Sequence, residues 1–500
     1  MFCLPPFLID GDESVSLGAE GVQVFVRPSV FYTWKGTIKM NDKHNLTTGS
    51  IPGKLISFAL PLLAANLLQS FYSLVDMLVV GRIVGETGLA AISNASMISF
   101  IINSVCIGIT MGGTVLAAQY KGAEDEHGQI EIIGTLFTVA FIAAVLVTAA
   151  GLAAYRPLFQ ILRVPGAAME DACGYMKIIC LGTVFVFGYN AVCSILKGLG
   201  DSNSPLYFVA VATAVNIGLD LLLVGPFGMG TEGAAYATIF SQGISFVISV
   251  FHLKRKDFVF DFQPSHFAVS PHKLAAILKI GLPTAVQMVV VNLSYLLITG
   301  MLNEFGVSVA AASGVGLKIN TFAGMPCWAI GQAVTAMAGQ NMGAGHTKRV
   351  RETAGAGLSL NLSITLIMVL LVQTFGKQLI YLFTPASPEV LAQGILYLRI
   401  CCGVNSLVYA AMYTFDSFAI GIGSANIAMF NALLDAVIVR LPASWLLAFP
   451  LGLGYPGVYI GQALSPFLPA VAGFLYFKSM KWENKRILQR EHSHTEHIKK

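Results

Sequence analysis

Charge is scarce in this 500-residue sequence. Charged residues make up 11% of the chain and hydrophobic residues 55%, whereas about 25% of a soluble domain is charged. The mean hydropathy over the whole length is +0.71, which excludes a soluble protein held by one anchor. Apolar runs recur from Leu55 to Phe477, and each is close to the ~20 residues that cross a bilayer core. The composition therefore predicts an all-α integral membrane protein with many spans.

The sequence also lacks the motifs that would assign a cofactor or a reaction. None of the eight cysteines forms a CxxC pair, so neither a zinc site nor a disulfide framework is indicated. There is no Walker lysine motif, so we expect no use of ATP. Gly228–Gly233 fits the GxGxxG pattern, but no strand precedes it, and a dinucleotide site requires a βαβ unit. We expect no enzyme activity, no cofactor and no nucleic-acid partner.

The apolar runs predict twelve membrane-spanning helices in two lobes of six. The spans are expected near residues 55–80, 89–119, 130–154, 173–197, 204–224, 232–253, 274–302, 307–339, 351–375, 392–418, 425–449 and 455–478. A polar N-terminal segment, an N-lobe, a cytoplasmic linker, a C-lobe and a cytoplasmic tail are expected at residues 1–50, 51–253, 254–273, 274–480 and 481–500. Met40 begins a short polar leader before the first span, and we interpret it as the native start.

Basic residues are distributed unevenly between the two ends of the predicted spans. With the N-terminus inside, the cytoplasmic loops hold Lys121, Lys197, Lys254, Arg255, Lys256, Lys273, Lys348, Arg349 and Arg351. The outer loops hold only Arg82, Arg156, Arg163 and Lys377. Because cytoplasmic loops carry the excess of Lys and Arg, we predict a plasma-membrane protein with both termini in the cytoplasm.

The two halves of the sequence resemble each other. The matching positions, 215 to 224 residues apart, are Pro61 with Pro283, Gln119–Ala123 with Gln340–Ala344, Asn216-x-x-x-Asp220 with Asn431-x-x-x-Asp435, and Gly233–Tyr236 with Gly457–Tyr459. Six spans in each half start both halves on the same side of the membrane. Repeats of this kind surround a central cavity and suit alternating access by a carrier.

Polar residues gather at one depth in the first half. Asp76 in span 1 and Asp220 in span 5 each lie five residues before the outer end of their helix, or about 7–8 Å below it. Asn216 lies one turn before Asp220, and Thr238 in span 6 lies about 9 Å below its own outer end. Two close carboxylates share one proton or cation, and oxygen ligands suit a hard cation such as Na⁺. The alternative for Asp76 is that it reaches the outer interface or caps a helix.

The second half repeats this pattern incompletely. Asn431 and Asp435 repeat Asn216 and Asp220, but Ile298 stands where Asp76 would fall. The other charges that we expect to be buried in this half are Lys318, Asp416 and Arg440. Lys318 or Arg440 could form a structural ion pair with a carboxylate, or could contact substrate. The sequence favours neither role.

In combination, these motifs resemble the MATE (multidrug and toxic compound extrusion) transporters over residues 51–480. The resemblance rests on Pro61, Gln69, Tyr72 and Val75-Asp76 with Val80-Gly81-Arg82, on the two repeated Gln119 and Gln340 segments, and on Asn216-x-x-x-Asp220 followed by Gly233 to Thr238. It implies a V-shaped pair of six-helix lobes and antiport of H⁺ or Na⁺ against organic, often cationic, compounds.

The resemblance also implies roles for single residues. Asp76 corresponds to the carboxylate of span 1, whose protonation is proposed to bend the helix at Pro61. The cation ligands of the N-lobe, which would hold Na⁺ if Na⁺ is the coupling ion, correspond to Asp76, Asn216, Asp220 and Thr238, and the cavity-lining residues to Gln69, Tyr72 and Asn190. Span 7 has no acidic residue before Glu304, and Asp416 does not align cleanly with the span-10 aspartate of the NorM branch. The chain therefore resembles the DinF-like branch more than NorM.

We thus expect a monomeric antiporter in the lipid bilayer that exports small organic cations in exchange for H⁺ or Na⁺. The first alternative is a flippase of lipid-linked oligosaccharides with a related fold. It should line its cavity with several Arg and Lys, which this sequence does not place there. An enzyme would need clustered catalytic groups at a loop face, and a channel has no need of duplicated lobes with one acidic site.

Overall fold

The computed structural model describes residues 44–162, 164–255, 258–383 and 387–483. Within these ranges the chain forms helices and turns, and no strand. All the helices belong to one unit that begins at Leu46. The suggested start at Met40, Lys256 of the linker and most of the 481–500 tail lie outside the described residues.

The helices follow the predicted apolar runs closely. The first half contains α1 (Ile51–Ile83), α2 (Glu86–Gly122), α3 (Glu126–Ile161), α4 (Gly166–Gly198), α5 (Asn203–Val224) and α6 (Gly230–Arg255), followed by the short 3-10 helix η2 (Pro264–Phe267). The second half contains α7 (Pro271–Asn303), α8 (Val307–Gly343), α9 (Thr347–Phe383), α10 (Pro388–Cys401), α11 (Val404–Gly421), α12 (Ala425–Leu433), the π-helix η3 (Leu434–Arg440), α13 (Leu441–Ala448), α14 (Tyr455–Leu464) and α15 (Phe467–Lys478).

Length and apolarity confirm the predicted all-α membrane fold. Among the described residues, ten helical segments are long and apolar enough to cross a membrane, and the bent pair α10 and α11 makes an eleventh. The one predicted span not among these is the span at 307–339, which corresponds to α8. This helix has 37 residues but is less apolar than the others. Because its second half, from Met325 to Met342, is largely buried in protein, its side chains do not need to be compatible with lipid.

The span predicted near 392–418 is present as a broken helix, in which α10 and α11 meet at an angle of 48°. Side chains replace the hydrogen bonds that the break removes. The Asn405 side chain donates to the Cys401 carbonyl (2.9 Å) and accepts from the Gly403 N–H (3.1 Å). Gln373 of α9 donates to two carbonyls at the end of α10, both at 2.9 Å. A broken helix is tolerated inside a membrane when its backbone groups find partners in this way.

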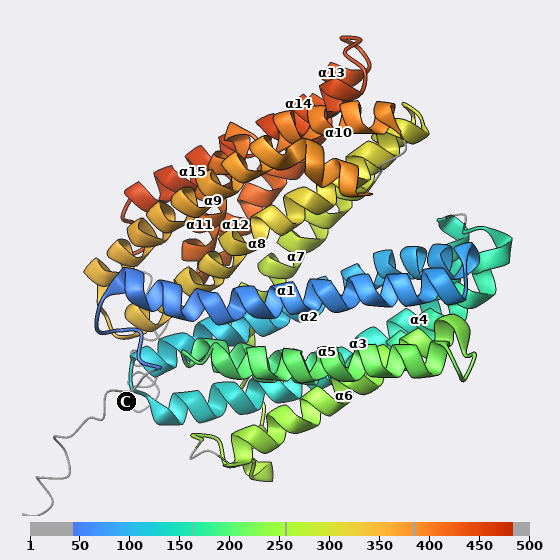
Figure 1. The fold of residues 1–500 in the computed structure, drawn as a ribbon. Coiled ribbons are helices and arrows are strands. Elements are labelled where there is room, and N and C mark those ends of the chain that lie inside the picture. Colours follow the sequence, from blue (N-terminus) through green and yellow to red (C-terminus); the bar gives the residue numbers. More distant parts are fainter. Residues whose placement is uncertain (1–43, 163, 256–257, 384–386, 484–500) are drawn as a thin grey trace, which may run out of the picture. The chain divides into compact units, whose positions relative to one another are not determined.

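Two helices from each half join the halves together. In Figure 1, helices α1 to α6, blue to green, lie side by side, and so do the yellow to red helices of the second half. Across the seam, α2 packs against α7 and α8, and α1 packs against α8. The sequence repeat relates α1 to α7 and α2 to α8, so the pairs α1–α8 and α2–α7 are equivalent contacts in the two halves.

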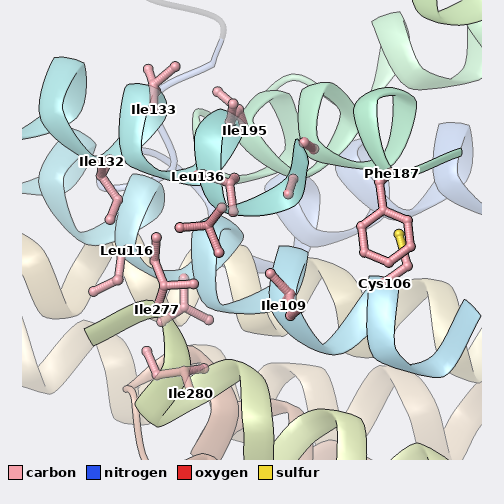
Figure 2. Packing of buried hydrophobic residues seen from close by; sticks show 14 of the residues in the cluster. Cys106, Ile109, Leu116, Ile132, Ile133, Leu136, Phe187, Ile195, Ile277 and Ile280 are labelled. Atoms are coloured by element: carbon pink, nitrogen blue, oxygen red, sulfur yellow. The ribbon is translucent and has the colours of Figure 1, made fainter. Parts of the chain in front are cut away.

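A buried apolar cluster anchors this seam from the first-half side (Figure 2). It combines residues of α2, α3 and α4 with two isoleucines of α7. The labelled members are Cys106, Ile109, Leu116, Ile132, Ile133, Leu136, Phe187, Ile195, Ile277 and Ile280. Close packing of these side chains, which drives association between membrane helices, fixes the beginning of α7 to the first half.

The ends of α2 and α8 cross so closely that only glycine fits. A Cβ atom on Gly122 would lie 1.8 Å from the carbonyl oxygen of Gln340, and one on Gly343 would lie 1.9 Å from the carbonyl oxygen of Gln119. Both obstacles are backbone atoms, which cannot rotate away as a side chain could. The repeated Gln-x-x-Gly segments of the sequence therefore form a point of closest approach between the two halves.

The two repeated glutamines add reciprocal hydrogen bonds to this crossing. The Gln119 side chain donates to the Gly421 carbonyl at the end of α11 (3.3 Å), and the Gln340 side chain donates to the Gly198 carbonyl at the end of α4 (3.0 Å). Each glutamine therefore binds the opposite half, and both are almost completely buried.

Replacing Gln340 by leucine is expected to lower the free energy of unfolding by about 1–3 kcal/mol, because buried polar groups lose their partners. The glutamine side chain accepts from the Leu46 N–H (2.9 Å) and donates to the Gly198 carbonyl, and leucine can do neither. Thermal unfolding of the purified protein measures the effect. Gln378→Leu, at an exposed position of α9, is the control; equal melting temperatures for the two variants would contradict the prediction.

Candidate cation-binding site

The packing of α1 against α5 brings the two predicted carboxyl groups together. The side chains of Asp76 and Asp220 lie within hydrogen-bonding reach of each other. Asp76 is 7% exposed and Asp220 is fully buried. The similar depth that we predicted from helix length therefore corresponds to a direct contact between the two helices. Asp76 does not reach the surface, which excludes the interfacial alternative.

Buried polar atoms of these carboxyls, and of two residues that precede Asp220 in α5, lack protein partners. They are Asp76 Oδ1, both carboxyl oxygens of Asp220, both side-chain amide atoms of Asn216, and Thr213 Oγ1. Two ionised carboxylates are both acceptors, so neither can satisfy the other without a shared proton or cation. Leaving such groups buried and unpaired costs about 1–3 kcal/mol each. The site therefore fits an additional positive charge surrounded by oxygen atoms.

The chemistry of this donor set limits which ion it could bind. Carboxylate, amide and hydroxyl oxygens suit a hard monovalent cation or a proton. Among the described residues, no group of three or more His, Cys, Asp or Glu could hold a metal ion. The two carboxylates and their neutral oxygen neighbours thus favour a weakly held, exchangeable ion over a tightly bound transition metal.

Thr213 and Tyr175 are two further candidate residues near this site that the sequence reasoning missed. Thr213 lies three residues before Asn216 and seven before Asp220 on α5, a helical spacing that could have identified it. Tyr175 of α4 is 7% exposed and interacts electrostatically with both carboxyls. No spacing in the sequence relates it to them, because the contact depends on how α4 packs.

The other predicted first-half residues surround the pair less directly. Tyr72 interacts electrostatically with both carboxyls, whereas Gln69, one turn from Tyr72 in α1, is exposed. Thr238 is half-buried on α6, which packs against α5 and α1. The Asn190 side chain donates to the Val186 carbonyl of its own helix (2.8 Å). Their roles as ligands or cavity residues stay predictions.

Pro61 lies inside α1, which continues without interruption from Ile51 to Ile83. The proline removes one backbone hydrogen bond from the helix interior. Such a position is suited to bending, and the predicted bend at Pro61 stays a prediction.

The second half contains a buried ion pair at the repeated position. Arg440 donates to Asp435 Oδ2 at 2.5 Å, and the two side chains are 4% and 2% exposed. Asn431 donates to Asp416 Oδ1 at 2.6 Å. Of the two roles left open for Arg440, the structure shows the ion pair.

Lys318 corrects the prediction of a buried charge, because its side chain is exposed. The buried positions in this part of α8 are Val309, Ala312, Ser313, Gly316 and Ile319. These residues share one face, since helical neighbours are three or four residues apart, and Lys318 lies on the opposite face. Lys318 therefore contributes no charge to the Asp435 cluster.

Comparison with known proteins gives a consistent result. The MatE family model matches residues 61–222 and again 283–446, so one model recognises both halves and confirms the internal repeat. The probable multidrug resistance protein YpnP of Bacillus subtilis is 30% identical over 89% of this chain and 98% of its own. The probable multidrug resistance protein NorM of Thermotoga maritima is 26% identical over 88% and 94% of the two chains.

Solved structures share the fold. A structure described as the outward-facing conformation of a multidrug resistance MATE family transporter superposes with a TM-score of 0.84, at 22% identity, over 90% of this chain and 99% of that chain. The twelve-span, two-lobe architecture is therefore common to both. The MatE model matches both halves of the chain, and YpnP is 30% identical to it over nearly the whole length of YpnP. This chain therefore belongs to the MatE family of membrane transporters.

Proposed function

We propose that this protein is a secondary active antiporter that exports small organic, chiefly cationic, compounds in exchange for H⁺ or Na⁺. The observation that carries the proposal is the Asp76–Asp220 contact, in which both carboxyl oxygens of Asp220 and one of Asp76 are buried without a hydrogen-bond partner. The names of the relatives, which refer to multidrug resistance, support export of several compounds.

The pair supplies a physical basis for coupling. With a proton or Na⁺ bound, the carboxyls attract the same ion and favour the observed contact between α1 and α5. Without it, repulsion between two buried carboxylates favours an arrangement in which α1 moves away. A cation that binds one arrangement better than the other shifts their equilibrium, and the substrate cavity changes with it.

Several further features belong to the same proposal. Both termini would lie in the cytoplasm and the chain would reside in the plasma membrane as a monomer, without using ATP. Coupling would take place in the first half, because Ile298, which is 3% exposed, replaces an acidic residue in α7. On this ground we place the chain nearer the DinF-like branch than NorM.

Proteoliposomes containing the purified protein test the proposal and identify the ion. A pH gradient and a Na⁺ gradient are imposed separately, with a fluorescent monovalent organic cation as the transported probe. We expect one of the two gradients to drive accumulation of the probe against its own gradient, and protein-free vesicles to give none. Absence of gradient-driven accumulation with both ions would overturn the proposal. No observation favours the flippase.

A further inference from the structure

The two halves neutralise the same repeated motif in different ways. In the first half, Asn216 and Asp220 are buried, and all four of their side-chain polar atoms are unpartnered. In the second half, the equivalent Asn431 and Asp435 are buried as deeply, but Arg440 binds Asp435. The residue five positions after Asp220 is Gly225, which supplies no charge. At the repeated Asn-x-x-x-Asp motif itself, the difference between the halves is therefore one arginine.

Arg440 is held in place by contacts on several sides. Besides Asp435, its guanidinium donates to Ser294 Oγ of α7 (2.9 Å) and to Ser465 Oγ (3.4 Å), and it lies 4.4 Å from the centre of the Tyr295 ring. These contacts come from three segments of the second half. Such a group cannot exchange with solvent, in contrast to a free ion.

The local backbone explains how aspartate and arginine meet. Residues 434–440 form a π-helix, in which hydrogen bonds join residues five apart instead of four. In an ordinary α-helix, side chains three or four apart share a face, whereas here the wider turn aligns Asp435 with Arg440. Short π-helical turns are frequent at functional sites.

The cluster keeps oxygen atoms that a cation could use. Asp435 Oδ1 and Asn431 Oδ1 are buried without a partner, and the amide of Asn431 also contacts Asp416 at 2.6 Å. Asp435, which binds the guanidinium, therefore lies in a cluster with Asn431, one turn before it, and with Asp416, which Asn431 binds. These carboxyl and amide oxygens are of the same chemical types as those of Asp220 and Asn216 in the first half, which have no hydrogen-bond partner.

We infer that Arg440 is a tethered cation, which permanently occupies in the second half the place that an exchangeable cation takes in the first. Its removal should turn Asp416, Asn431 and Asp435 into a site for a monovalent cation, Na⁺ or a proton. The inference rests on the proposed function in one respect, since it takes the first-half pair to be the exchangeable site. It adds that the arginine restricts ion dependence to one half.

Thermal unfolding of the full-length purified protein tests this inference without a transport assay. The Asp76→Asn/Asp220→Asn background removes the first-half carboxyls, so any remaining ion response comes from elsewhere. In this background, melting temperatures are compared for the protein with Arg440 and for the Arg440→Ser variant. Each is measured in NaCl and in choline chloride, at about pH 8 and at about pH 5.5, where a buried carboxyl group can protonate.

With Arg440 present we expect almost no difference between the conditions. With Arg440→Ser we expect a low melting temperature that rises by several degrees, saturably with Na⁺ or on acidification, because ligand binding to the folded state stabilises it. A rise with Na⁺ at the higher pH identifies a Na⁺ site, and a rise with acid alone identifies a proton site. No rise with either cation, including a protein that neither recovers, would overturn the inference.

Two further variants separate charge replacement from general loss of packing. Arg440→Lys keeps the positive charge but loses the planar guanidinium, and should remain unresponsive to Na⁺ and acid. Asp435→Asn/Arg440→Ser removes the proposed ion ligand, and should lose the response that Arg440→Ser gains. A response that survives the loss of Asp435 would show that the ion binds elsewhere. Failure of the transport proposal leaves these results unaffected, because no step depends on substrate movement.

Discussion

Asp220→Asn is expected to lower ion-coupled export by roughly 5- to 150-fold, since coupling free energies between sites are typically about 1–3 kcal/mol. Asparagine keeps the size of the side chain and can donate a hydrogen bond to Asp76. The site then carries one carboxylate instead of two and has less need of a cation. An ion that no longer distinguishes two conformations cannot shift their equilibrium. Asp76→Asn should have the same effect, because the two carboxyls share one charge.

Gradient-driven accumulation in proteoliposomes measures this effect, with the amount of folded protein in the membrane determined in parallel. Glu232→Gln is the matched control, because it removes an exposed acidic side chain on α6 of the same half. The thermal stability of Asp220→Asn should be maintained or raised, since an uncompensated buried charge has been removed. Full coupled transport by Asp220→Asn would show that coupling does not depend on this pair.

Replacing Gly122 by valine is expected to have the largest effect on stability. The first added carbon already lies 1.8 Å from the Gln340 carbonyl oxygen, so α2 and α8 must move apart. Overpacking a close contact costs about 1–3 kcal/mol and sometimes more, and here the separation also breaks the reciprocal hydrogen bonds of Gln119 and Gln340. We expect a cost at the upper end of this range, measured by thermal unfolding, together with reduced transport. Gly343→Val should behave alike, because the contact is reciprocal.

Gly314→Ala tests whether glycine replacement as such is harmful. Gly314 lies in α8, as Gly343 does, but a Cβ atom there meets nothing within 4 Å. Alanine favours a helix over glycine by about 1 kcal/mol, so this variant should be as stable as the original protein or more so. If Gly122→Val melts at the same temperature as Gly314→Ala, the crossing does not depend on the absence of a side chain.

The carboxyl contact could be predicted because it follows from helix geometry. From the predicted span ends, Asp76 and Asp220 were placed at one depth by the rise per residue. In the structure α1 ends seven residues after Asp76 and α5 ends four residues after Asp220, a difference of about one helical turn that does not prevent the contact. The position of Lys318 could not be predicted from its depth alone. Depth does not say which face of α8 meets protein, and that face is set by the packing of α10 and α11 against it. Tyr175 was missed for the same reason, since its contact depends on where α4 lies.

The sequence by itself determined the membrane-spanning class, the duplication and the acidic first half, because hydropathy, internal matches and residue spacing are properties of the chain alone. Only the tertiary structure decided three other features: the break at Gly403, the glycine crossing of α2 with α8, and the ion pair of Arg440. In each case the deciding partner is remote in sequence or depends on a local change of helix type. A backbone carbonyl of the other half leaves no room for a side chain at Gly122. Gln373 of α9 donates hydrogen bonds to the carbonyls at the helix break, and a π-helical turn aligns Arg440 with Asp435.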